Sequence, residues 1–77
     1  MIEEHDEVVL TRDLPKTPFV AGDCGVVVHI YPGAVAYELE FFSGDGQTIG
    51  VHTAESSCVR SLTSREVSHV RELAGIG

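Results

Sequence analysis

Two histidines and a glutamate are the residues of this sequence with the most suggestive chemistry: His29, Glu38 and His52. Imidazole nitrogens and a carboxylate form a ligand set that zinc accepts. The three lie in separate apolar runs that indicate neighbouring β-strands, and their side chains meet only if the strand register brings them opposite one another. The register derived below places them in one row on the outer face, with Glu40 one step along. Cross-strand His–Glu pairs are also ordinary stabilising neighbours on a solvated sheet face.

Catalytic chemistry has less support from residue types and spacing. Ser56, Ser57 and Cys58 are nucleophile types, and four histidines are available as bases. No glycine elbow, phosphate loop or HExxH spacing connects them. Glu38 and Glu40 point the same way from one strand, which suits acid–base work but also solvates an open face. We therefore expect no enzymatic activity, no catalytic residue and no cofactor.

Turn signals divide the chain into the short apolar runs that are typical of strands. Two prolines in the connector 13–23 exclude a helix or a central strand there. Such a loop is where a small barrel often keeps its binding surface. Short strands on one compact chain predict a mainly β fold, a small five-stranded barrel. The expected strands are 7–12, 24–31, 36–42, 48–53 and 59–62.

The register follows from the rule that a slip of one residue turns the apolar set outward. That rule selects a four-residue turn at 32–35 and a five-residue turn at 43–47. The two turns place apolar residues opposite one another in the pairs Ile30–Tyr37, Val28–Leu39, Val26–Phe41, Phe41–Ile49 and Leu39–Val51. On the outer face the same register pairs His29 with Glu38 and Glu38 with His52.

Residues 63–77 have a different pattern. Thr63-Ser64-Arg65-Glu66 fits a capping box, apolar residues follow at helical spacing, and Gly75 is a stop signal. We predict a short amphipathic helix over 63–77 after a barrel over 1–62. A helix of this length is marginal alone, so it would pack on its own barrel, serve a contact with a partner or with a second copy of the chain, or stay frayed.

Length and charge restrict the class of partner. The chain has 77 residues, enough for one small domain. It carries 12 acidic and 5 basic residues, a formal charge of −7, and has no Lys or Arg between Thr17 and Val59. This acidic middle repels phosphate, which disfavours nucleic acid. The N-terminus lacks a secretory signal, and no apolar run approaches the ~20 residues that span a bilayer. We expect a cytoplasmic protein that does not bind membranes.

Several short motifs together resemble one family. They are Val8-Val9-Leu10-Thr11, Asp13-Leu14-Pro15, Ala21-Gly22-Asp23-x-Gly25-x-Val27-Val28-His29-x-Tyr31, Ala36-Tyr37-Glu38-x-Glu40-Phe41 and Gly46-x-Thr48. In these motifs the chain resembles the short bacterial proteins catalogued as domain of unknown function 4926, over about Glu4 to Leu62. The resemblance implies an SH3-like barrel of unassigned role, related in shape to the barrel of the nitrile hydratase beta subunit. It implies no catalytic residues.

The acidic charge, the small size and the proline-containing connector favour a non-catalytic protein-binding module. We expect its acidic surface to dock a basic protein partner, in the manner of an antitoxin or immunity protein, with acids steering association and aromatic side chains anchoring it. The expected contact residues are Phe19, Asp23, Glu38, Glu40, Phe42 and Asp45.

Two alternatives stay open. Gly22-Asp23-x-Gly25-x-Val27 is similar to the glycine-centred strand of KOW-type barrels, which bind RNA or ribosomal proteins, although any tight turn before a barrel strand favours the same residues. Against RNA, the basic residues lie only near the two ends of the predicted barrel. The second alternative is a metal-binding barrel that uses His29, Glu38 and His52 as ligands.

Overall fold

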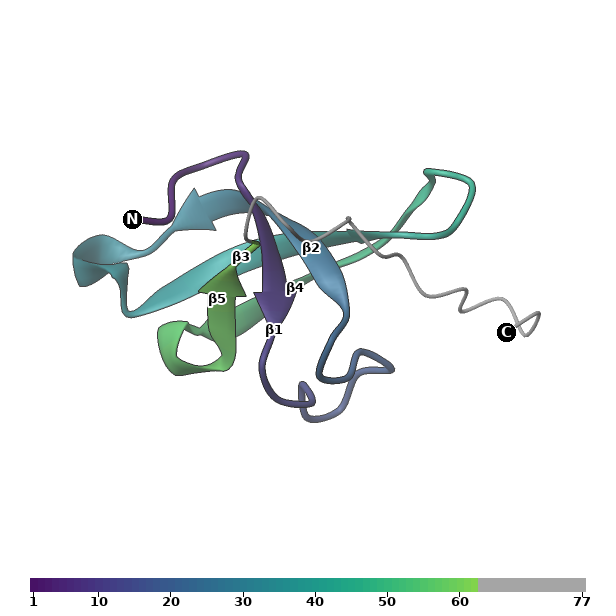
Figure 1. The fold of residues 1–77 in the computed structure, drawn as a ribbon, viewed down its shortest axis with the longest axis horizontal. Helices are drawn as coiled ribbons and strands as arrows, with labels where there is room; N and C mark the ends of the chain where they lie inside the picture. Colours follow the sequence, from purple (N-terminus) through teal and green to yellow (C-terminus); the bar gives the residue numbers. More distant parts are fainter. Residues whose placement is uncertain (63–77) are drawn as a thin grey trace.

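A computed structural model describes residues 1–62, which form one sheet of five antiparallel strands (Figure 1). The strands are β1 (Glu7–Leu10), β2 (Cys24–Ile30), β3 (Ala36–Phe42), β4 (Thr48–Glu55) and β5 (Val59–Ser61). Two short 3-10 helices, η1 (Pro32–Ala34) and η2 (Ser56–Cys58), precede β3 and β5. The predicted mainly β fold is therefore confirmed. The predicted helix over 63–77 lies outside the described residues.

The strand order is β4-β3-β2-β1-β5. β2, β3 and β4 form a meander of consecutive hairpins, whereas β5 returns across the molecule to pair with β1. Val8 lies opposite Ser61 and Leu10 opposite Val59 in this last pairing. Figure 1 shows β1 and β5 side by side in front of the long β3–β4 hairpin, which extends away from them. In residues 1–62 no helix has both the length and the apolar character that a membrane span requires.

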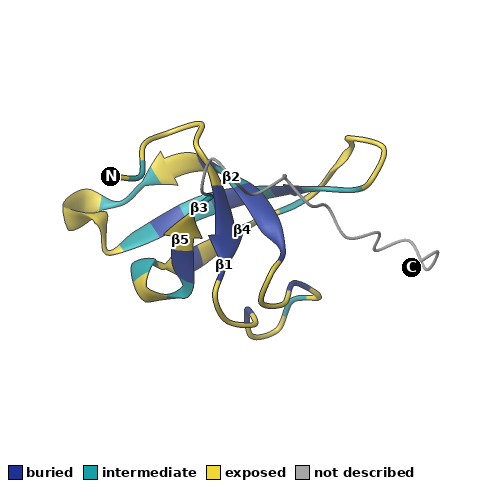
Figure 2. Ribbon diagram, viewed as in Figure 1, coloured by how far each residue is buried: buried dark blue, intermediate teal, exposed yellow. Residues whose placement is uncertain are grey.

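The inward-facing side chains of β3, Tyr37, Leu39 and Phe41, are buried and form part of the core (Figure 2). Apolar side chains from the other strands and from the first connector complete it, among them Val8, Leu10, Leu14, Phe19, Val27, Ala54 and Val59. Gly25 on β2 allows the close approach of β3. A Cβ added there would lie 3.2 Å from both the Glu40 carbonyl oxygen and the Phe41 ring.

A bulge in β2 changes which of its residues face the core. The pairing next to the turn agrees with the prediction, but Val27 rather than Val28 lies opposite Leu39. Val28 is the additional residue, and it is exposed whereas Val27 is fully buried. The predicted pairs beyond this point were therefore wrong by one residue. Val26, predicted to face inward, lies opposite Glu40 instead.

A second irregularity occurs in β4. The turn 43–47 has the predicted five residues and places Phe42 opposite Thr48. The register then shifts, because Phe41 lies opposite Gly50, and Ile49 is the additional residue. His52 then lies opposite Leu39, where Val51 was predicted. As a result both Ile49 and Val51 are exposed. The two bulges lie on the two strands that flank β3, and together they determine what its outer face carries.

Candidate protein-interaction surface

Cross-strand pairing places two rows of side chains on the outer face of the sheet. The first row crosses four strands and consists of Glu7, Val26, Glu40 and Val51. The second row crosses three strands and consists of His29, Glu38 and Thr53. These seven residues are called the acidic face below. Its carboxylates are separated across the strands by apolar, hydroxyl or imidazole side chains.

Glu38 is held in place by two hydroxyl groups. The Tyr31 hydroxyl donates to Oε1 of Glu38 at 3.1 Å, and the Thr53 hydroxyl donates to the same oxygen. The predicted pairing of His29 with Glu38 is confirmed. The His29 ring stands edge-on to the Tyr31 ring, with centroids 4.8 Å apart. The carboxylate of Glu38 is thus fixed in direction, and its side chain is only half-buried.

Glu40 has a simpler environment. The Thr48 hydroxyl donates to Oε2 of Glu40 at 2.6 Å. Val26 and Val51 lie directly opposite Glu40 on the two neighbouring strands, and Val51 is 47% exposed. A fixed carboxylate beside exposed apolar surface suits a Lys or Arg side chain, because the alkyl stem packs on the apolar surface while the charged end reaches the carboxylate.

The turn between β3 and β4 extends the acidic surface. Asp45 at its tip is exposed and accepts hydrogen bonds from the Ser43 hydroxyl and, at 3.3 Å, from the N–H of Gln47. The Ser43 hydrogen bond is the main reason that the pKa of Asp45 lies below its ordinary value. Phe42, at the base of the turn, is half-buried. Four of the six predicted contact residues therefore lie along β3 and this turn: Glu38, Glu40, Phe42 and Asp45.

The other two predicted contact residues, Phe19 and Asp23, are buried. Phe19 is 3% exposed, and its ring stacks on Phe41 with centroids 4.0 Å apart. Asp23 is 6% exposed, and its carboxylate accepts the N–H of Val20 at 2.9 Å. Their burial contradicts the prediction that they contact a partner. The connector folds back on the sheet because its side chains satisfy its own backbone and fill the core.

The predicted metal-ligand row is also wrong. The register shift in β4 places Thr53, and not His52, opposite Glu38. The His52 ring faces inward and lies 5.4 Å from the Phe19 ring, measured between centroids. His29, Glu38 and His52 therefore do not share one face. Among residues 1–62, no group of three His, Cys, Asp or Glu side chains is placed to hold a metal ion.

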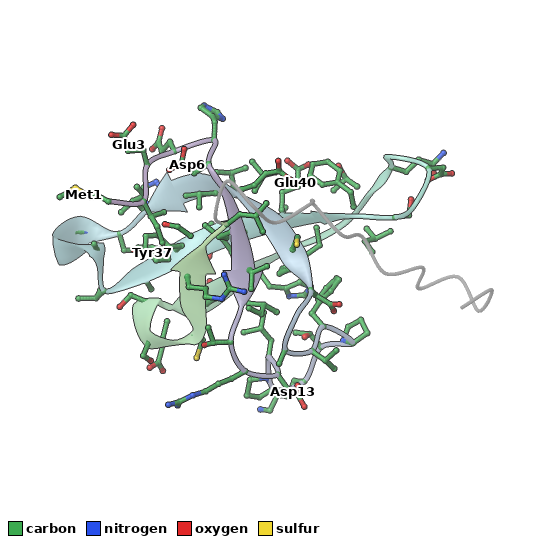
Figure 3. The ribbon with its side chains drawn as sticks, in the orientation of Figure 1. Met1, Glu3, Asp6, Asp13, Tyr37 and Glu40 are labelled. Atoms are coloured by element: carbon green, nitrogen blue, oxygen red, sulfur yellow. The ribbon has the colours of Figure 1, made fainter. Side chains whose placement is uncertain are left out.

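Sequence reasoning missed the contribution of the N-terminus to this surface. Glu7 heads the first row of the acidic face through its pairing with β2. In Figure 3 Glu3, Asp6 and Glu40 lie on the upper side of the molecule, whereas Asp13 lies on the lower side. The signal that points to this contribution is the acidic run directly before the first apolar run, where four of residues 3–7 are Glu or Asp.

The chain matches a known protein family. A family model described as Domain of unknown function (DUF4926) matches residues 4–61. No curated protein and no solved structure gives a significant match. The matched range contains every strand of the sheet and every residue of the acidic face.

Proposed function

The chain belongs to the DUF4926 family, a domain of unknown function, and we propose that it is a non-catalytic protein-binding module whose acidic face docks a basic protein partner. The arrangement around Glu40 carries this proposal. Its carboxylate is fixed by Thr48 beside the exposed Val51. A Lys or Arg side chain of a partner fits such a surface, because its alkyl stem packs on the apolar side chain while its charged end binds the carboxylate.

Two further observations support docking rather than catalysis. Glu38 and Glu40 both accept hydroxyl hydrogen bonds from within the chain, which suits carboxylates that serve as fixed charges. The formal charge of −7 attracts a basic partner over a distance and raises the association rate at low salt. An antitoxin-like or immunity-like role is one in which a small acidic protein covers a basic partner in this way.

The fold that presents the acidic face is proposed to be an SH3-like barrel. The order β4-β3-β2-β1-β5, in which a meander is joined by β1 and by a returning β5, supports this shape. The turn η2 directly before β5 redirects the chain from the meander to β1. We propose the cytoplasm as the compartment, since Cys24 and Cys58 are both free thiols, as reducing conditions would keep them.

The proposal is tested with a charge-matched pair of variants. Glu38→Gln/Glu40→Gln removes two negative charges but leaves oxygens that accept the same hydroxyl hydrogen bonds. Ala21→Lys/Ser61→Lys adds two positive charges at exposed positions outside the acidic face. Both variants change the formal charge by 2, from −7 to −5.

Tagged wild-type and variant proteins are compared in pull-downs from host lysate at low and moderate salt, with bound protein and RNA both identified. We expect one basic protein to be retained by the wild type and by Ala21→Lys/Ser61→Lys. The glutamine variant should retain at least about tenfold less, because each lost charge pair contributes of order 1 kcal/mol. Equal retention by the two variants contradicts docking at the acidic face, and retention of RNA would favour the KOW-like alternative.

A further inference from the structure

β4 forms one edge of the sheet that the described residues build. It is eight residues long and contains no Pro, Lys or Arg. Those residue types, a short length and covering segments are the usual means by which proteins prevent pairing at an edge. β5, at the opposite edge, has only three residues. Unlike β5, β4 is therefore long enough for another strand to pair with it. The bulge at Ile49 lies near one end of β4, so the rest of the strand is regular.

The hydrogen-bonding phase of β4 shows which backbone groups face away from β3. The N–H of Ser56 donates to the carbonyl oxygen of Val35 at 3.0 Å. Residues of an antiparallel pair alternate between bonding their partner strand and facing away from it. Ala54 and His52 therefore bond to β3. The residues that direct their N–H and C=O groups toward the open edge are Val51, Thr53 and Glu55.

The backbone groups that face away from β3 lie beside the acidic face, because Val51 and Thr53 contribute to both. A strand added beside β4 would place alternate side chains next to Val51 and Thr53 on the outer face. Strands lie about 4.8 Å apart, so a Lys or Arg there spans Val51 with its stem and reaches Glu40. On the inner face the neighbours are His52 and the buried Ala54, which favour an apolar side chain.

The geometry points to strand addition at the β4 edge by an extended segment of the partner in which basic and apolar residues alternate. This inference rests on the proposed function, since Glu38 and Glu40 are the charges that the added strand would meet. A second copy of the chain is a poorer occupant than a basic segment. Each copy carries a formal charge of −7, and pairing two β4 edges would bring Glu55 of each copy to the same interface.

The probe is a short end-blocked peptide of alternating lysine and valine, with its affinity for the full chain measured at low salt by calorimetry. Two N-methylated versions keep every charge but block the N–H groups on one side of the peptide strand. In antiparallel addition the lysines lie opposite Val51, Thr53 and Glu55 and share hydrogen bonds with them. Methylating the lysine nitrogens should therefore weaken binding at least about tenfold, and methylating the valine nitrogens by less than about threefold.

A pair of protein variants examines the same edge from the other side. Val51→Pro removes one outward N–H without removing a bond to β3, because proline is tolerated at edge positions of this kind. Val51→Thr keeps that N–H and the branched shape. We expect Val51→Pro to weaken peptide binding about tenfold and Val51→Thr about twofold at most. If Val51→Pro does not fold, the methylated peptides still test the wild-type chain.

The outcomes separate this inference from the proposed function. Sensitivity to methylation on one side only supports strand addition, and the reverse selectivity would assign a parallel orientation. If both methylated peptides bind as tightly as the parent, or if no peptide binds, strand addition is overturned while docking at the acidic face still depends on the glutamine variant. A wild-type dimer in sedimentation that Val51→Pro abolishes would identify a second copy as the occupant and would also overturn the inference.

Discussion

The two faces of β3 are built on different principles. Inward, Tyr37, Leu39 and Phe41 are buried against side chains from the rest of the chain. Outward, Glu38 and Glu40 are half-exposed; two hydroxyl groups hold Glu38, and one hydroxyl holds Glu40 beside the exposed Val51. Because successive side chains of a strand point to opposite faces, β3 serves two purposes. The inward face accounts for the stability of the fold, and the outward face is rigid without being covered.

The largest expected effect separates two adjacent phenylalanines. Phe41→Ala should lower the free energy of unfolding by about 3–5 kcal/mol, because a fully buried ring leaves a cavity. Phe42→Ala should cost about 1 kcal/mol, since the Phe42 ring is only half-buried. Urea denaturation followed by circular dichroism measures both. Equal losses would show that the two faces contribute alike to stability.

A smaller effect is expected on the outward face, from the hydroxyl groups that hold Glu38. Tyr31→Phe removes the hydroxyl that donates to Glu38 and should lower the free energy of unfolding by about 1 kcal/mol. The loss should largely vanish in a Glu38→Ala background, because the hydroxyl then has no carboxylate to bind. Urea denaturation of the four proteins of this cycle provides the measurement. An undiminished loss in that background would mean that Tyr31 acts independently of Glu38.

The smallest effect concerns the exposed turn. The Ser43 hydroxyl lowers the pKa of Asp45 in the folded chain. The resulting stabilisation is present above the pKa of the unfolded chain and is lost as the pH falls through the lower folded value. Ser43→Ala should raise the pKa of Asp45 toward its ordinary value near 3.8. Carboxyl-carbon NMR titration of Asp45 in the wild type and in Ser43→Ala measures this change, and an unchanged Asp45 titration would contradict this role of the hydroxyl.

Strand positions could be predicted from the sequence, because alternation and turn residues are local signals. The third strand has the predicted bounds, and both turns have the predicted lengths. The bulges could not be predicted. Three consecutive valines, Val26 to Val28, satisfy either phase of β2, and only packing against β3 decides between them.

The bulge in β4 and the burial of Phe19 have a common cause. Gly50 occupies an inward position, and a Cβ there would lie 2.9 Å from Nε2 of His52 and 3.9 Å from the Phe19 ring. Phe19, from the connector, and His52 therefore fill the space that a larger inward residue would occupy. If the connector is treated as an exposed loop, the Phe19 ring is not available to fill the core. The register in which Ile49 faces inward and fills that space is then favoured.

The candidate surface was predictable in part for the same reason. Glu38 and Glu40 alternate with apolar residues on β3, so their outward direction follows from the strand period alone. Asp23 looks equally available in the sequence, but its carboxylate is used by the connector itself. Val51 joins the surface only through the register shift. Local periodicity thus located the two carboxylates on β3, whereas tertiary packing selected their apolar neighbours.

The pairing of β1 with β5 has a consequence for the order of folding. Val8 meets Ser61, a separation of 61 − 8 = 53 residues, whereas the hairpins of β2, β3 and β4 close over short turns. Loop closure costs more entropy over longer separations, so the hairpins are expected to form first and β5 to join last. During synthesis, β5 cannot pair with β1 until Ser61 has left the ribosome. Until then β1 pairs with β2 on one side only. The growing chain is then most exposed to misassociation until β5 arrives.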